Sequence, residues 1–230
     1  MCGVADEFTF ETSRGPAAGV LHARADAAAV VVLGHGAGSG MGSPFMAGIA
    51  AALADLGLAV ARFDFPYMHA GRKPPDPAPA LIETWRTARD AVAERTGGLP
   101  FVAGGKSLGG RIASMAVAEG MAAEALVFLG YPLHPPGRTD KLRRDHLAQI
   151  GVPMLFLQGS RDAFAQPGLL AETIDSLGGR ATLVEVEGGD HSFRVPGGPR
   201  DGATIGAGLA PQVADFVAGI VAGAERQPPP

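Results

Sequence analysis

Short apolar runs alternate with helical segments along this 230-residue chain, and this alternation restricts the fold more than any other feature. The run 28–33 is typical of a strand buried on both faces of a parallel sheet. We expect further strands around Phe8 and Phe10 and over 19–24, 58–65, 100–104, 125–129, 152–157 and 181–186. We expect helices from Pro44 (after Ser43 as N-cap) to a stop at Gly57, and over 80–96, 107–119, 139–150, 168–177 and 203–222. Such alternation predicts βαβ units with right-handed crossovers, in an α/β fold with a mostly parallel sheet flanked by helices.

Glycine and proline are unusually frequent, at 34 and 19 residues, although 47% of the chain is apolar. A chain this long and apolar can bury a sizeable core. The glycines and prolines are therefore expected to mark turns and close backbone approaches, which favours α/β over a helical bundle. No repeat or linker is visible, so we expect a single domain over 1–230, with frayed ends at about 1–5 and 225–230.

Charge and composition exclude several classes of protein. The 19 basic and 23 acidic residues form no basic block, which argues against a nucleic-acid partner. The single cysteine, Cys2, excludes a disulfide framework, and the histidines show no paired spacing, so neither a metal nor another cofactor is expected. The apolar run 27–33 is too short to span a bilayer and no signal peptide is visible, which predicts a cytoplasmic protein with no membrane association.

A G-x-S-x-G pentapeptide, 105–109, lies between an expected strand and an expected helix. In that context it is typical of a nucleophile elbow, a strained turn that presents a serine at the end of a strand. Ser107 is therefore the candidate nucleophile, and Lys106 is expected to pack or pair beside the site. The alternative is a turn whose serine only caps a helix. A phosphate-binding loop does not fit, because Pro100 stands where G-x-x-x-x-G-K-S requires glycine.

A serine needs a base and an orienting acid to become a nucleophile. Asp162 follows one expected strand and His191 follows the next, so both lie where the carboxyl ends of parallel strands collect ligands. The chain order Ser107, acid, histidine is that of one of the known triad arrangements. Asp190 is a rival acid, although it is poorly placed to bond the Nδ1 of its neighbour, and Asp64 is a weaker rival.

Two backbone N–H groups are expected to form an oxyanion hole. Leu108 follows the nucleophile, and the second donor is expected from the glycine-rich segment 34–38, at Ala37 or alternatively Gly36. A structural hydrogen bond is the expected role of His35. The segment lacks the later glycine of a dinucleotide fingerprint, which excludes that function.

Four short motifs now show a family resemblance: LGHGAGS, GGKSLGGR, GSRD and GGDHSF. Together they resemble the α/β-hydrolase superfamily in its small, lidless, dienelactone-hydrolase-like branch. RFDFPYMHAGRKPPDP and FLGYPLHPPG resemble, more narrowly, the hydrolase-like domain of a subunit of the non-specific-lethal histone acetyltransferase complex. The resemblance runs from about Val30 to the last helix and implies an eight-stranded sheet and serine hydrolase activity. Dienelactone hydrolases carry cysteine where Ser107 stands, so their substrate does not transfer.

These features predict a serine hydrolase that cleaves an ester or thioester of a small soluble acid through an acyl-enzyme. The connection 130–151 is too short for a lid, which favours short acyl chains. A peptidase or amidase of the same fold and a non-catalytic interaction module are the alternatives; an N-terminal nucleophile amidotransferase built on Cys2 lacks supporting motifs. Four residues near the loop after 58–65 could bind an anionic substrate group or serve the fold: Arg62, Tyr67, Arg72 and Lys73.

Overall fold

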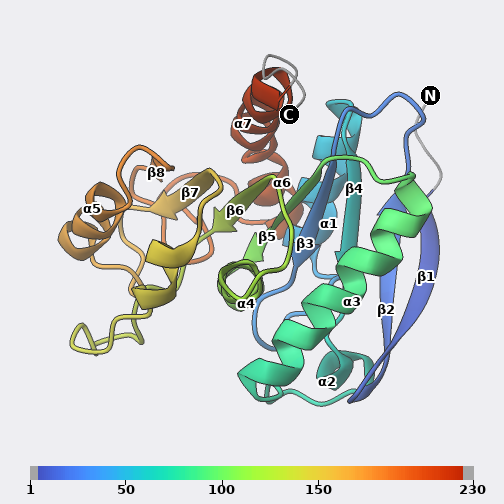
Figure 1. The fold of residues 1–230 in the computed structure, drawn as a ribbon. Helices are drawn as coiled ribbons and strands as arrows, with labels where there is room; N and C mark the ends of the chain where they lie inside the picture. The colour runs from blue at the N-terminus through green and yellow to red at the C-terminus, as the bar shows by residue number, and fades with distance from the viewer. Residues whose placement is uncertain (1–4, 225–230) are drawn as a thin grey trace.

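Eight strands form one twisted, mostly parallel sheet in the computed structural model, which describes residues 5–224 (Figure 1). The strands are β1 (Ala5–Thr12), β2 (Gly15–His22), β3 (Val30–Gly34), β4 (Ala59–Phe63), β5 (Phe101–Lys106), β6 (Ala125–Leu129), β7 (Met154–Gly159) and β8 (Ala181–Val186). Their order is β1-β2-β4-β3-β5-β6-β7-β8, with β2 antiparallel to both β1 and β4 and the remaining pairs parallel. The predicted α/β sheet is confirmed.

Helices cover both faces of this sheet (Figure 1). They are α1 (Pro44–Asp55), α2 (Pro66–His69), α3 (Ala78–Thr96), α4 (Leu108–Ala118), the 3₁₀ helix η1 (Asp145–Gln149), α5 (Pro167–Ser176), α6 (Gly202–Ala207) and α7 (Ala210–Ala224). Helices α1, α6 and α7 enclose one apolar core, and α3 and α4 enclose the other. No cap domain covers the sheet within residues 5–224.

Strand β3 shows why a continuous apolar run belongs at the centre of such a sheet. Val30 and Val32 face the core under α3 and α4, whereas Val31 and Leu33 face the core under α1. All four side chains are fully buried. Because each buried aliphatic side chain contributes roughly 1.5–3 kcal/mol, this strand anchors both layers.

The prediction of a helix over 139–150 is wrong, because this segment contains only the short 3₁₀ helix η1. The backbone N–H of Arg143 donates to the carbonyl of Leu133 at 2.8 Å, and that of Lys141 donates to Arg138 at 3.0 Å. These donors are therefore committed to loop contacts instead of the i−4 carbonyls of an α-helix. The connection between β6 and β7 is consequently an irregular, hydrogen-bonded loop.

The helix expected over 203–222 is divided into α6 and α7. Pro211 lies in the first turn of α7, where its missing N–H is tolerated, but it cannot continue a preceding helix. By length and composition Gly202–Gly223 could cross a membrane, with a mean hydropathy of 1.5. In the structure Ile205, Val213 and Val217 of this stretch are buried in the core beside α1.

Smaller differences concern ends of elements. Ser43 stands at the N-cap of α1, but its side chain makes no capping hydrogen bond. The sequence did not predict the one-turn helix α2 after β4. Ala5, expected to be frayed, begins β1 and pairs with His22. The other residues expected to be frayed, and Cys2, lie outside the described residues.

Candidate active site

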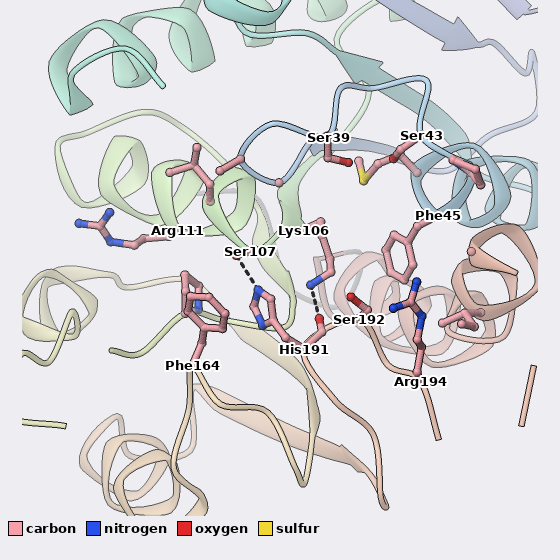
Figure 2. A pocket seen from close by; sticks show the side chains of 18 of the residues that line it. Ser39, Ser43, Phe45, Lys106, Ser107, Arg111, Phe164, His191, Ser192 and Arg194 are labelled. Carbon is pink, nitrogen blue, oxygen red and sulfur yellow. Dashed lines mark hydrogen bonds between the residues drawn. The ribbon is translucent and has the colours of Figure 1, made fainter. Parts of the chain in front are cut away.

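A cavity of about 630 Å³ opens at the edge of the sheet where the parallel strands end (Figure 2). Ser107 and His191 line it, as do Ala37 and Leu108, whereas Asp162 is buried behind the histidine. The volume lies within the range of small-molecule sites, which is about 300–1,000 Å³. The structure therefore gathers the sequence-predicted residues around one small-molecule-sized cavity.

The turn that carries Ser107 has a strained backbone held by glycines. Ser107 has φ 49° and ψ −110°, in a region that side-chain-bearing residues rarely adopt. Gly105 has φ 145°, and a Cβ on either Gly105 or Gly109 would lie 2.1 Å from the carbonyl oxygen of Gly34. Only glycine at both positions lets the turn and the start of α4 lie directly on β3. This packing thrusts Ser107 out at the strand end.

Ser107, His191 and Asp162 form a continuous hydrogen-bonded chain. The Ser107 hydroxyl lies 2.9 Å from His191 Nε2, and His191 Nδ1 lies 2.6 Å from Asp162 Oδ2. The carboxylate oxygen of Asp162 is the acceptor in this bond, so the imidazole proton belongs on Nδ1 and Nε2 accepts from the serine. This is the geometry a base needs to take the serine proton.

Asp162 is held from several sides in a buried position. Its Oδ2 also accepts from Gln158 Nε2 at 2.5 Å, and its Oδ1 accepts from the backbone N–H of Phe164 at 2.8 Å. Gln158 in turn accepts from the N–H of Tyr131 at 2.8 Å. The ring of Phe164 lies against the His191 imidazole, with centroids 4.2 Å apart. Gln158 was not predicted; its signal was a polar residue at the end of an otherwise apolar strand.

The two rival acids bond elsewhere. Asp190 Oδ1 accepts from the backbone N–H groups of Ser192 and Arg194, at 2.8 and 2.9 Å, and so closes the turn that carries the histidine. Asp64 Oδ1 accepts from the N–H of Met41 at 2.6 Å. Neither carboxylate contacts His191 among the interactions of residues 5–224, so the assignment of the acid to Asp162 is retained as a prediction.

The candidate oxyanion donors face the same cavity. Ala37 and Gly36 lie on the loop after β3 and Leu108 opens α4, and all three line the cavity beside Ser107. His35 is fully buried beneath the loop: its Nδ1 donates to Gly36 O at 2.7 Å, and its Nε2 accepts from the N–H of Phe65 at 3.2 Å. Burial lowers the pKa of His35, which favours the neutral tautomer that makes both bonds. His35 thus anchors the loop, as expected.

Lys106 reaches from the elbow to the histidine loop. Its Nζ donates to the carbonyl oxygen of His191 at 2.5 Å (Figure 2). The same Nζ lies 5.4 Å from the Phe193 ring centroid. Burial lowers the pKa of Lys106 to about 8, and the carboxylates of Asp162 and Asp190 oppose this shift. The expected pairing of Lys106 beside the site is confirmed, with a backbone carbonyl as the partner.

Three of the four residues that could bind an anionic substrate group make contacts within the fold instead. Arg62 donates to the carbonyl of Met41 at 2.6 Å, Arg72 pairs with Asp76 at 2.9 Å, and Tyr67 is fully buried. None of these, nor the exposed Lys73, is among the described residues that line the cavity.

The lowered pKa of Lys106 predicts a pH-dependent stability. The unfolded chain binds the lysine proton up to a pH near 10.5, whereas the folded protein releases it near 8, so stability rises with pH between these values. From pH 7 to pH 10 the free energy of unfolding of the wild type should rise relative to Lys106→Met by about 2 kcal/mol. Urea titrations of both proteins measure the difference, and parallel pH curves would contradict a buried, charged lysine.

The chain is similar to known proteins in sequence and in fold. Residues 27–220 match the family model described as an alpha/beta hydrolase domain. A dienelactone hydrolase from Anabaena variabilis superposes with a TM-score of 0.76 at 21% identity, over 95% of this chain and 99% of that chain. A serine hydrolase without lid from Xanthomonas campestris gives 0.69 at 18% identity, over 98% and 97%.

A cold-adapted esterase from an Arctic intertidal metagenomic library gives a TM-score of 0.68 at 19% identity, over 92% of this chain and 93% of that chain. At these identities the structures show a shared fold and not a shared substrate. The narrower resemblance to the histone acetyltransferase complex subunit stays a prediction. The family match spans most of the sequence and agrees with the eight-stranded sheet, and the chain shares its fold with a dienelactone hydrolase and a serine hydrolase without lid, so this chain belongs to the alpha/beta hydrolase family.

Proposed function

We propose that this protein is a serine hydrolase that cleaves an ester or thioester of a small soluble acid. The observation that carries the proposal is the chain of hydrogen bonds from Ser107 through His191 to Asp162, at 2.9 and 2.6 Å, at the wall of an open cavity. A buried acid, a histidine and an exposed serine in this order have the separate roles that acyl transfer requires.

The reaction proceeds in two halves. Ser107 Oγ bonds to the carbonyl carbon while its proton moves to His191 Nε2, and the N–H groups of Leu108 and Ala37 stabilise the oxyanion. The C–O or C–S bond then breaks, and His191 gives the proton to the departing alcohol or thiol. Water attacks the acyl-enzyme in the same way, and the acid leaves as Ser107 regains its proton. Asp162 stabilises the imidazolium in both halves.

The strained serine argues against one of the two alternatives, and an experiment decides on the other. A non-catalytic interaction module has no need for a strained serine, and strain of this kind costs about 1–3 kcal/mol unless function uses it. A peptidase or amidase would use the same three groups, so the substrate series below decides between these chemistries.

The shape of the site supports short substrates. The β6–β7 connection lines the cavity with Pro132 and Arg143 but carries only the 3₁₀ helix η1, so it forms no lid. An open cavity without a lid favours short acyl chains, because among the described residues the β6–β7 connection adds only Pro132 and Arg143 to its wall. We also retain the cytoplasm as the proposed location and a small molecule as the proposed partner.

The two acids make different predictions for turnover. Asp162→Asn removes the group that holds the His191 tautomer, so kcat for a short ester should fall by up to about 10⁴-fold. Asp190→Asn should cost much less, because Asp190 bonds backbone N–H groups and not the imidazole. Steady-state kinetics of the two matched variants test this, and the reverse ranking would transfer the role to Asp190.

Acyl length gives a second test. The open cavity predicts that kcat/KM for p-nitrophenyl esters falls beyond medium chain length, with no rise at the micelle concentration. Ser107→Ala is the control and should lose up to about 10⁶-fold in kcat. Matched acyl thioesters and anilides run in parallel, and faster cleavage of the anilides would favour an amidase. Long-chain preference with a steep rise above the micelle concentration would mean that the β6–β7 connection acts as a lid.

A further inference from the structure

Positive charge without negative charge faces the cavity beside Ser107. The 19 described residues that line the cavity include no Asp or Glu and four cations, Lys106, Arg111, Arg143 and Arg194. Six other arginines pair with carboxylates at 3.3 Å or less. Within residues 5–224, Arg111 and Arg143 form no such pair. Asp162 and Asp190 act on Lys106 from behind the cavity, whereas the two arginines have no carboxylate partner among the described residues.

Arg111 is one helical turn beyond the nucleophile. Its backbone N–H donates to the carbonyl of Ser107 at 3.1 Å, which fixes its place in the first turn of α4. Its Nε is buried with no hydrogen-bond acceptor in the described part of the chain. Figure 2 shows Arg111 on one side of Ser107 and Arg194 on the other. A buried donor without an acceptor is costly unless a ligand supplies one.

Arg143 reaches the same cavity from the β6–β7 connection. Its backbone is held on both sides, because its N–H donates to Leu133 O at 2.8 Å and its carbonyl accepts from the Tyr131 hydroxyl at 2.6 Å. Burial lowers the pKa of the Arg111 guanidinium, and the nearby positive charge of Arg143 lowers it further. Two like charges that line one cavity repel each other, and an anion bound between them would remove that repulsion.

We propose that the ester cleaved at Ser107 carries a second, anionic group, a carboxylate or a phosphate, which Arg111 and Arg143 bind together. This inference rests on the proposed hydrolase function. The planar guanidinium fork suits both kinds of oxyanion through paired, charge-assisted hydrogen bonds. Four residues of α-helix advance by about 6 Å, so the anion is separated from the ester carbonyl by a short chain.

Two matched substrate pairs test the charge and its position. Monoethyl adipate carries a carboxylate on the acyl side, and ethyl adipamate replaces it with a neutral amide of similar shape. The butyryl ester of glycerol 3-phosphate carries a phosphate on the alcohol side, and monobutyrin lacks it. The wild type should prefer the anionic member of one pair by about tenfold or more in kcat/KM, since charge-assisted bonds contribute this much. The pair that shows the preference identifies the source of the anion.

Variants test whether the preference for an anionic ester depends on these two arginines or on the overall positive charge of the protein. Arg143→Gln, and independently Arg111→Lys, should bring the anionic-to-neutral ratio of kcat/KM toward one. Arg144→Gln is the control, because it removes the same charge one residue away, where the side chain donates to Thr173 at 3.1 Å and does not line the cavity. Its ratio should stay at the wild-type value. Circular dichroism and thermal melts verify that each variant folds.

Binding to Ser107→Ala separates failure of this inference from failure of the proposed function. Calorimetry with the four esters should show tighter binding of the anionic member, lost in Ser107→Ala/Arg143→Gln. If the wild type cleaves none of the four esters but this binding pattern appears, the anion site stands and the hydrolase proposal fails. If the wild type cleaves neutral and anionic esters equally, or if Arg144→Gln lowers the ratio as much as Arg143→Gln, the anion site is refuted.

Discussion

The contact between the elbow and strand β3 is the constraint on which the site depends. A Cβ at Gly105 or Gly109 would lie 2.1 Å from Gly34 O. The turn and the start of α4 can therefore lie against β3 only because both positions are glycine. That approach forces Ser107 to φ 49° and directs it into the cavity. The strain is tolerated because the cores on both faces of the sheet hold β3 and β5 in register.

A layer of buried hydrogen bonds behind the cavity orients the groups in front. Gln158 fixes Asp162, which fixes His191, while Lys106 holds the carbonyl of His191 from the other side. The partners come from β5 and from the end of β7 with the turn that follows it, so the histidine loop after β8 is tied to two other segments. Preorganisation of this kind is what electrostatic stabilisation of a transition state requires.

The sequence predicted those parts that depend on local pattern. Strands 125–129 and 181–186 were predicted with their observed ends. The positions of Ser107, Asp162 and His191 just after expected strands predicted that all three lie at one edge of the sheet. Tertiary contacts decided the rest. Backbone bonds within the β6–β7 connection, such as Arg143 N–H to Leu133 O, kept 139–150 from forming a helix, and Arg143 lines the cavity from that same irregular loop. Hydrogen-bond partners far apart in sequence, such as Lys106 with His191, follow no spacing rule.

Labelling with a fluorophosphonate probe tests the central claim most directly, because the probe reacts only with a serine that a base has activated. We predict stoichiometric modification of the folded protein, mapped by peptide mass spectrometry to Ser107 and absent in Ser107→Ala. Labelling should also be strongly slowed in His191→Gln, which keeps the serine but removes its base. A folded wild-type protein that stays unlabelled at Ser107, or that labels equally well without His191, would contradict the account.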